Sequence, residues 1–263
     1  MSALAGRADP RPPAPWVRVV APIVVGLAIL AVWFLLVDVL HAAPRALPSP
    51  VAILTEVGKH YGIILEDMGI TATNALVGLA AGTILAIVLA ALAVTFRPID
   101  GMLAPLVAAL AVVPIVAITP ILNTMFGASS QFGRQYVAAI AAFIPVFVNV
   151  LRGLRQTRPV HRDVLRASAA SGAQTFRYLT LPTALPYLLT GLRIASSVAV
   201  IAALVAEYFG GPADGIGTAI ATYAKSGRAA LAFAYVAGGI AIGLVLFLVT
   251  SLLERLVSRR TSV

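Results

Sequence analysis

Residues 157–186 read TRPVHRDVLRASAASGAQTFRYLTLPTALP, a polar and basic stretch between two apolar runs that are each long enough to cross a membrane. Pro159 suits the first turn of a helix, where its missing N–H costs nothing. Asp163 follows early in that helix, where the helix dipole favours a negative charge. Apolar residues recur at helical spacing, namely Val160, Val164 and Leu165. The stretch is therefore predicted to begin with a short amphipathic helix.

The same stretch predicts a second helix. Ser171-Gly172 interrupts the pattern, as glycine does at the C-terminus of a helix. The second segment, Ala173–Thr180, carries Phe176 and is expected to stop at Pro182. We expect two short helices joined by a turn, outside the bilayer. Loops of this length are usually functional or disordered, and the helical periodicity argues against disorder.

Composition places the chain in a membrane. Of its 263 residues, 60% are hydrophobic and 11% are charged, whereas about 25% of the residues of a soluble domain are charged. The net charge of +9 does not indicate nucleic-acid binding here, because the basic residues flank apolar runs, where membrane topology explains them. The chain has no cysteine, which excludes disulfides and cysteine chemistry.

Six apolar runs of about 20 residues predict an all-α, polytopic membrane protein. They cover approximately Val19–Leu40, Gly69–Val94, Met102–Leu122, Gln135–Leu151, Leu185–Phe209 and Leu231–Leu253. We expect a membrane domain over residues 19–254, a disordered tail over 1–18 and a second tail over 255–263. Small residues every four positions in the second run predict close helix packing; they are Gly78, Gly82, Ala86 and Ala90.

Basic residues indicate the orientation. With the N-terminus in the cytoplasm, internal segments hold about thirteen basic residues and external segments about five. The positive-inside rule therefore places both termini and the opening stretch in the cytoplasm. The external loops would be His41–Met68, with an amphipathic segment at Val51–Leu65, then Asn123–Arg134 and the Gly-rich Gly210–Gly217.

Polar residues and prolines inside the runs are candidates for a translocation path. An intramembrane charge is a functional candidate by default, but a charge near an interface can simply snorkel or cap a loop. Asparagines can line a path or join helices by hydrogen bonds, and prolines can be packing kinks. Arg193, inside the fifth run, can likewise be a functional charge or a charge that snorkels to the interface. The possible path residues are Pro114, Asn123, Pro145, Asn149 and Glu207.

No enzyme constellation is present in the sequence, and no catalytic residue, metal site or cofactor is predicted in this chain. The three histidines lie in different loops without metal-ligand spacing. A P-loop needs Gly-Lys followed by Ser or Thr, and neither of the two lysines, Lys59 and Lys225, stands in that context. If the protein uses energy, that energy must come from a partner or a gradient.

Several motifs resemble the permease subunits of bacterial ABC importers. Leu181-Pro182 match the end of their cytoplasmic coupling loop, and Thr183–Ala195 looks like its usual continuation into the next helix. Asp163 then takes the acidic position of that loop and Ala169 the position usually held by glycine. The AEYFGG segment, Ala206–Gly211, is similar to a subgroup that moves pyrimidine precursors and related heterocycles.

Further pieces resemble the nitrate/sulfonate/taurine-type permeases and follow the same order. They are LPSP (Leu47–Pro50), VPIVAITP (Val113–Pro120), FG (Phe126-Gly127), FIPVFVN (Phe143–Asn149) and DGIG (Asp214–Gly217). The resemblance covers about Leu47–Glu254, and it implies a type I importer permease fold in the bacterial inner membrane.

The resemblance implies a set of partners. These are a second permease subunit, expected as a homodimer, two cytoplasmic subunits that bind ATP and Mg²⁺, a periplasmic or lipid-anchored binding protein, and membrane lipid. The coupling loop, residues 157–182, would dock on the ATPase. Its expected docking residues are Val160, Arg162, Asp163, Val164, Leu165, Arg166, Ala169, Ala170, Ser171, Gly172, Phe176, Leu181 and Pro182.

Two alternatives remain open at this point. A gradient-driven secondary transporter would show inverted repeats and buried ion-coordinating groups, and the basic loop would then be a lipid-facing surface. Within the importer interpretation, the subgroup resemblance favours a heteroaromatic vitamin precursor of pyrimidine or riboflavin type. A small anion such as sulfonate, taurine or nitrate is the alternative solute.

Overall fold

The computed structural model describes residues 17–40, 47–127 and 129–261, and within these ranges every regular element is helical. In chain order the elements are α1 (Val17–Phe34), the π-helix η1 (Leu35–Val39), α2 (Pro50–Thr95), α3 (Arg97–Val112), α4 (Ile115–Phe126), α5 (Phe132–Arg155), α6 (Pro159–Ala167), α7 (Gly172–Thr175), the π-helix η2 (Phe176–Thr180), α8 (Leu181–Tyr208), α9 (Gly215–Lys225) and α10 (Ala229–Thr261). Most of the predicted tail 1–18 lies outside the described residues.

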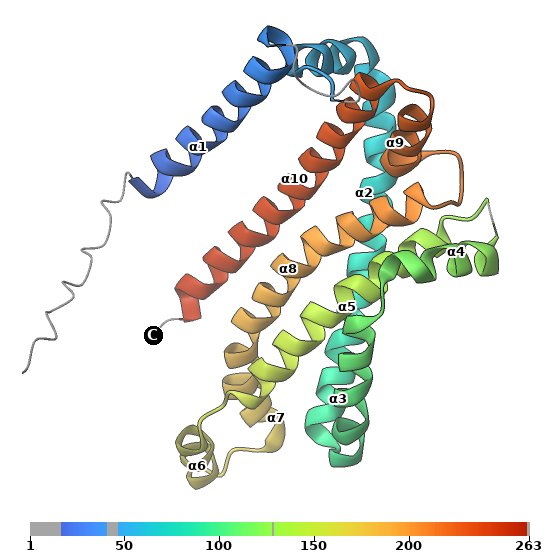
Figure 1. Cartoon of the computed structure of the whole chain (residues 1–263). Coiled ribbons are helices and arrows are strands. Elements are labelled where there is room, and N and C mark those ends of the chain that lie inside the picture. Colours follow the sequence, from blue (N-terminus) through green and yellow to red (C-terminus); the bar gives the residue numbers. More distant parts are fainter. Residues whose placement is uncertain (1–16, 41–46, 128, 262–263) are drawn as a thin grey trace, which may run out of the picture.

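Five helical segments of the described chain are long and apolar enough to cross a membrane, and a bent pair could supply a sixth. The predicted span over Met102–Leu122 is divided between α3 and α4, which meet at 97° (Figure 1). Val113 and Pro114 are both extended at the bend. The physical reason is Pro114, which lacks an N–H and disfavours helical geometry at the residue before it.

The amphipathic segment Val51–Leu65 is helical and is joined to the second span within α2, which has 46 residues. A kink at His60, where the backbone angles are not helical, divides α2 into a first part that lies across the end of the bundle next to α9 and a second part that runs along the bundle (Figure 1). Ser49 caps the first turn of α2 by accepting a hydrogen bond from the Ala52 N–H. The part after the kink, residues 61–95, is about 52 Å long at 1.5 Å per residue, which exceeds the hydrocarbon thickness of a bilayer. Part of α2 must therefore stand outside the membrane.

Close helix contacts form the core. All four small residues of the predicted stripe on α2 are buried, which agrees with that prediction. A Cβ on Gly78 would lie 2.4 Å from the Ala138 Cβ of α5, and one on Gly82 would lie 2.4 Å from the Ala139 carbonyl oxygen. On the other side of α5, a Cβ on Gly191 of α8 would lie 3.1 Å from the Val146 Cα. Helix α5 thus lies between α2 and α8, and α10 packs on α8.

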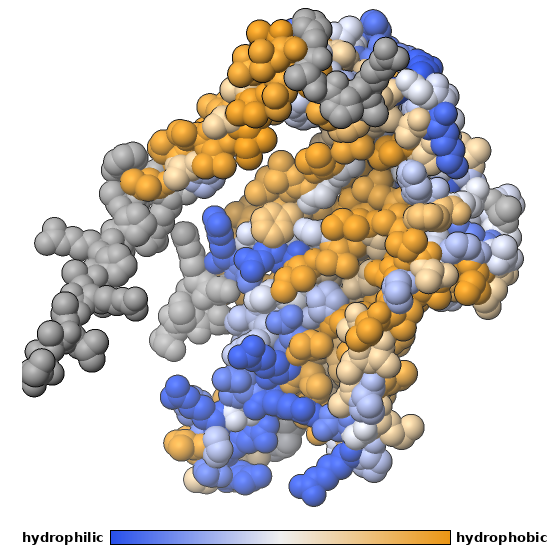
Figure 2. Space-filling model, in the orientation of Figure 1, coloured by the Kyte–Doolittle hydropathy of each residue, from blue (hydrophilic) through white to orange (hydrophobic). Residues whose placement is uncertain are grey.

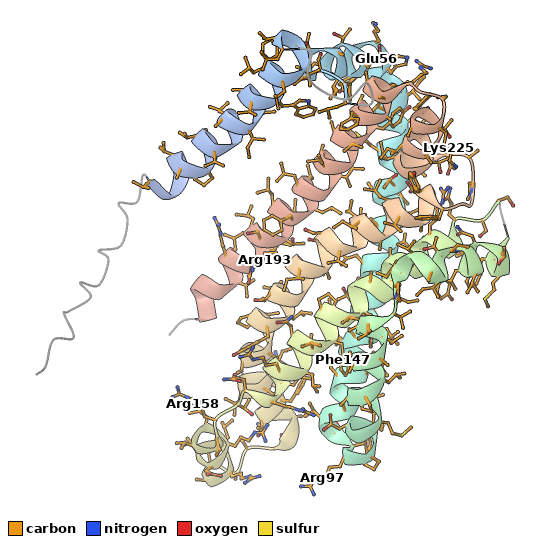
Figure 3. All side chains as sticks on the ribbon, in the orientation of Figure 1. Glu56, Arg97, Phe147, Arg158, Arg193 and Lys225 are labelled. Carbon is orange, nitrogen blue, oxygen red and sulfur yellow. The ribbon has the colours of Figure 1, made fainter. Side chains whose placement is uncertain are left out.

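The two ends of this bundle differ in chemistry. Figure 3 shows Arg97 and Arg158 at one end, called here the α6 end, and Glu56 and Lys225 at the opposite end, called the α9 end. Between them α1 and α10 present a largely apolar surface (Figure 2). Helix α1 stands away from the core, and its apolar span is 0% buried. Such a helix is compatible only with lipid or another protein around it.

Candidate coupling loop and polar network

Helix α6 begins the candidate coupling loop as predicted from the sequence. Arg158 is extended and Pro159 occupies the first helical turn, where proline costs no hydrogen bond. The side chains of Val160 and Val164 lie one turn apart and are exposed, while Leu165 is half-buried. Asp163 and Arg166 form an exposed ion pair of 3.5 Å. The helix therefore carries exposed apolar and charged residues side by side.

The turn after α6 corrects one prediction. The helix ends at Ala167, not at Ser171-Gly172, and Ala169 has a φ of +53°. The Ala169 N–H donates to the Arg166 carbonyl (2.9 Å) and the Ala170 N–H donates to the Leu165 carbonyl (3.0 Å). These two bonds form a Schellman motif, whose left-handed residue is usually glycine. Ala169 occupies that left-handed position, so the local fold explains a preference for a small residue there.

Gly172 begins the next helix instead of ending the previous one. Ser171 accepts a hydrogen bond from the Gln174 N–H (3.3 Å), and the Gln174 side chain accepts one from the Ser171 N–H (2.7 Å). This reciprocal pair is a capping box, which satisfies two N–H groups at a helix start.

Pro182 does not stop the second helix, contrary to the prediction. The helical run continues from Gly172 to Tyr208. Within it the five residues of η2 form a π-turn, in which the Leu181 N–H bonds to the Phe176 carbonyl. Pro182 follows directly as the second residue of α8, so the run accommodates its missing N–H immediately after the π-turn. Phe176 and Leu181 remain exposed on this segment.

The five possible path residues do not come together in one place. Pro114 lies exposed at the α3–α4 bend. Asn149 donates to the Pro145 carbonyl of its own helix (2.8 Å), and both lie against Gly191 of α8. Asn123 is buried, and its Nδ2 lies 3.5 Å from the Ala206 carbonyl oxygen.

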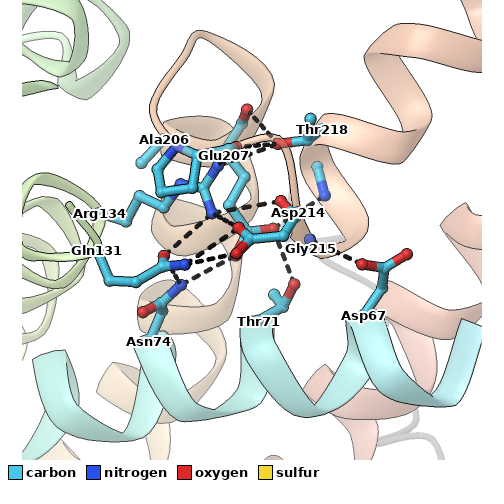
Figure 4. A network of polar contacts seen from close by, with 12 residues as sticks. Asp67, Thr71, Asn74, Gln131, Arg134, Ala206, Glu207, Asp214, Gly215 and Thr218 are labelled. Carbon is cyan, nitrogen blue, oxygen red and sulfur yellow. Dashed lines mark hydrogen bonds and ion pairs between the residues drawn. The ribbon is translucent and has the colours of Figure 1, made fainter. Parts of the chain in front are cut away.

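Glu207 is the fifth of these residues and the centre of a buried network, shown in Figure 4. Its side chain is 1% exposed. The Thr71 hydroxyl donates to its Oε2 (2.8 Å), the Asn74 amide donates to its Oε1 (3.3 Å), and the Gly217 N–H donates to its Oε2 (2.9 Å). Every partner is a donor, which suits a carboxylate. Glu207 therefore ties α8 to α2 and α9.

Arg134 completes the network. It was expected at the end of an external loop, and it lies in the first turn of α5, where it is 0% exposed. Its guanidinium donates to the Asp214 carboxylate (2.6 Å), to Gln131 (3.1 Å) and to Thr218 (3.1 Å). It also donates to the backbone carbonyls of the α8–α9 loop, those of Gly210, Pro212 and Asp214.

Gln131 links the two halves of this network. Its amide nitrogen donates to both carboxylate oxygens of Asp214 (2.9 and 3.1 Å), and its carbonyl accepts from Asn74 (2.9 Å). We call this cluster the polar network; its members are Thr71, Asn74, Gln131, Arg134, Glu207, Asp214 and Thr218. Sequence reasoning missed it because Arg134 and Asp214 are eighty positions apart, and no local pattern pairs them.

The N-terminus of α9 is seated on side chains from two other helices. Its first three N–H groups, at Gly215, Ile216 and Gly217, donate to Asp67, Thr71 and Glu207, each at 2.9 Å. These N–H groups have no partners within their own helix. The helix dipole also favours a negatively charged carboxylate at this end of the helix. With 11 residues, α9 is too short to cross a bilayer.

Arg193 has a structural partner. Its guanidinium lies 2.9 Å from Glu254 of α10, and Thr190 donates to the same carboxylate (2.6 Å). Ser196 and Thr250 form a second polar contact between the same helices, at 3.1 Å. The charge at Arg193 therefore joins α8 to α10.

Comparison with known proteins decides the family. The family described as the binding-protein-dependent transport system inner membrane component matches residues 78–263. The chain belongs to this family. It is a multi-pass transmembrane permease of the ABC importer type. The family is that of the membrane component, so the sequence expectation of a non-catalytic subunit agrees with it.

Individual relatives cover most of the permease. It is 32% identical over 168 residues to the formylaminopyrimidine transport permease protein ThiX of Halalkalibacterium halodurans, covering 64% of this chain and 67% of the relative. It is 29% identical over 204 residues to the nitrate import permease protein NrtB of Synechocystis, covering 72% of each chain.

A solved structure supports the fold. The permease resembles one chain in the crystal structure of an amino acid ABC transporter with histidines, with a TM-score of 0.62 and 17% identity. The match covers 76% of this chain and 96% of that chain. The helical arrangement described above is thus that of an ABC transporter permease.

Proposed function

We propose that this permease belongs to an ATP-driven importer of a small solute, and that its coupling loop docks on an ATP-hydrolysing subunit. The observation that carries the proposal is the apolar face of α6. Val160 and Val164 are 67% and 59% exposed, at the end of the bundle where the loop projects (Figure 1). An amphipathic helix with such a face fits a groove on a protein partner.

Charged residues beside this face favour a specific partner. Asp163 and Arg166 are exposed and paired with each other, so they contribute little to the stability of the free chain. At the rim of an interface, the same charges would set register and association rate more than affinity. Arg162 adds a third exposed charge. The full docking set is the one predicted from the sequence, Val160 to Pro182.

The orientation and partners follow from this proposal. The α6 end would face the cytoplasm together with both termini and tails, and the α9 end would face the periplasm of a bacterial inner membrane. ATP and Mg²⁺ would bind to two partner ATPase subunits. A second copy of the permease would complete the path, and a periplasmic or lipid-anchored binding protein would deliver the solute.

For the solute we favour a heteroaromatic vitamin precursor of pyrimidine or riboflavin type. The support is the 32% identity to a formylaminopyrimidine permease over 64% of this chain and to a riboflavin permease over 62%. A small anion is the second candidate, supported by the nitrate relative. The polar path candidates are separated within the described residues, so a binding protein would select the solute. Within the permease, Pro114, Asn123, Pro145, Asn149 and Glu207 remain proposed path residues.

Co-purification tests the docking proposal. The permease is co-expressed with its cognate ATPase and purified in detergent as wild type, Val164→Asp and Ala169→Trp. We expect a stoichiometric ATPase with the wild type and its loss in both variants, because one puts a charge on the apolar face and the other enlarges the left-handed residue. Ala224→Trp, an exposed change at the α9 end, is the matched control.

The outcomes separate the alternatives. Retention of the ATPase by both variants would place docking elsewhere. A wild-type permease that binds no ATPase would favour a gradient-driven transporter, with α6 as a surface attracted to anionic lipid.

A further inference from the structure

Two helices connect the coupling loop with the polar network. Helix α5 ends at Arg155, directly before the loop, and carries Arg134 in its first turn at the opposite end. The helical run that includes α8 begins at Gly172 inside the loop and carries Glu207 near its far end. Helix α5 is about 36 Å long at 1.5 Å per residue. Both helices that leave the coupling loop therefore end in the same buried cluster.

The α8–α9 loop is shaped around this cluster. Gly211 has a φ of +95°, and a Cβ there would lie 2.9 Å from the Arg134 Nε. Gly215 has a φ of +83°, and its Cβ would lie 2.7 Å from the Glu207 carboxyl carbon. Any side chain at either position would be strained and would push against a buried charged group. The loop thus has little freedom to separate from α5 and α8.

We propose that Arg134, Glu207 and Asp214 lock α9 to the ends of α5 and α8, so that this helix pair and α9 move as one rigid body during transport. The inference rests on the proposed function and adds a role for the end opposite the coupling loop. Arg134, Glu207 and Asp214 are positioning residues in this role: they act on the outer opening through α9. A displacement of the coupling loop would then be transmitted in full to the α9 end of the bundle.

The energetic cost of separating the helices favours a unit in which α9 stays packed on α5 and α8. Separating α9 from α5 would take Asp214 and Thr218 from the buried guanidinium of Arg134, and separating α9 from α8 would take the Gly217 N–H from Glu207. Breaking an ion pair that involves a buried charge costs far more than its formation contributes. Rigid-body movement of packed helices avoids that cost.

Distance measurements test the rigid body. The chain has no cysteine, so Phe132→Cys on α5 and Lys225→Cys on α9 introduce two unique labelling sites, both exposed. Spin labels there are measured in the assembled transporter, with labelled permease diluted by unlabelled permease. We expect the same distance distribution without nucleotide and in an ATP-trapped state. A shift between the two states would overturn the proposal, since the network would then open.

Network variants test its role in coupling. Asp214→Asn keeps the side-chain shape but removes the charge that faces Arg134, and Gln131→Ala removes the link between Asp214 and Asn74. We expect the ATPase to stay bound and to hydrolyse ATP, while solute imported per ATP falls about fivefold or more. The label distances should broaden in the same variants. Loss of folding in one variant leaves the other to decide.

A matched control separates this effect from a general change of charge. Glu56→Gln is the same carboxylate-to-amide change on α2, outside the network, where Glu56 pairs with Lys59 at 3.2 Å. It should leave the ratio of solute to ATP at the wild-type value. Wild-type ratios in both network variants would overturn the proposal. Absence of ATPase from the wild-type complex would instead remove the proposed function on which it rests.

Discussion

Replacing Gly82 with alanine should separate α2 from α5. The added Cβ would lie 2.4 Å from the Ala139 carbonyl oxygen and 3.0 Å from the Phe143 nitrogen. Ordinary contact for such atoms begins at 3.4 Å, so the two helices must move apart by about 1.0 Å (3.4 − 2.4). Backbone atoms of a regular helix cannot step aside alone, so the shift involves the whole interface.

The size of the effect follows from two opposed contributions. Alanine is favoured over glycine within a helix by about 1 kcal/mol. Overpacking a tight interface costs about 1–3 kcal/mol, and a gap of 0.5–1 Å forfeits a quarter to a half of the dispersion energy of neighbouring contacts. We therefore expect Gly82→Ala to lower the free energy of unfolding by about 1–2 kcal/mol.

The same substitution at Gly69 is the control. Gly69 lies on α2 with nothing within 4 Å of an added Cβ, so Gly69→Ala should stabilise the chain by about 0.5–1 kcal/mol. Unfolding is followed by circular dichroism in mixed micelles of dodecyl maltoside and SDS. Equal unfolding midpoints for Gly82→Ala and Gly69→Ala would refute the close contact between α2 and α5.

Three further predictions concern single side chains. Ser171→Cys should react with a membrane-impermeant maleimide only after cells are opened; reaction in intact cells would invert the proposed orientation. Ser171→Ala removes the capping box, worth about 1 kcal/mol, and should speed amide exchange at Gly172–Gln174; unchanged exchange would contradict the cap. Arg193→Gln should lower the unfolding midpoint, and adding Glu254→Gln should restore part of the loss, because no unpaired charge then remains. Strictly additive losses would argue against the pair.

The sequence by itself determined the membrane architecture. Apolar length, small residues every fourth position and arginines between the spans are local patterns. Apolar segments of this length form helices in lipid, because every backbone N–H and C=O group must find its hydrogen-bond partner within its own segment. The same local logic predicted α6, since Pro159 and the Val160–Leu165 stripe act within one helix. The resemblance to importer permeases also rested on short motifs and agreed with the family match.

Predictions from a single proline or glycine failed where neighbouring residues changed the effect of that residue on the helix. Pro182 was expected to end a helix, yet the helical run continues past it after a π-turn. Pro114, by contrast, lies at a bend of 97° between α3 and α4, which agrees with the interpretation of such prolines as kinks. Glycine was misread at Gly172, which starts a helix because Ser171 and Gln174 cap it. The outcome at each residue depends on which hydrogen bonds nearby groups supply.

Only the tertiary structure decided the polar network. Arg134 and Asp214 are eighty positions apart, and Thr71 and Glu207 are 136 apart. In the sequence each is an isolated polar residue near the end of an apolar run, indistinguishable from a charge that snorkels to the interface. Helix packing brings them together in a buried volume, where an unpaired charge is too costly to persist. Their partners are therefore set by the arrangement of α2, α5, α8 and α9, and no local pattern encodes it.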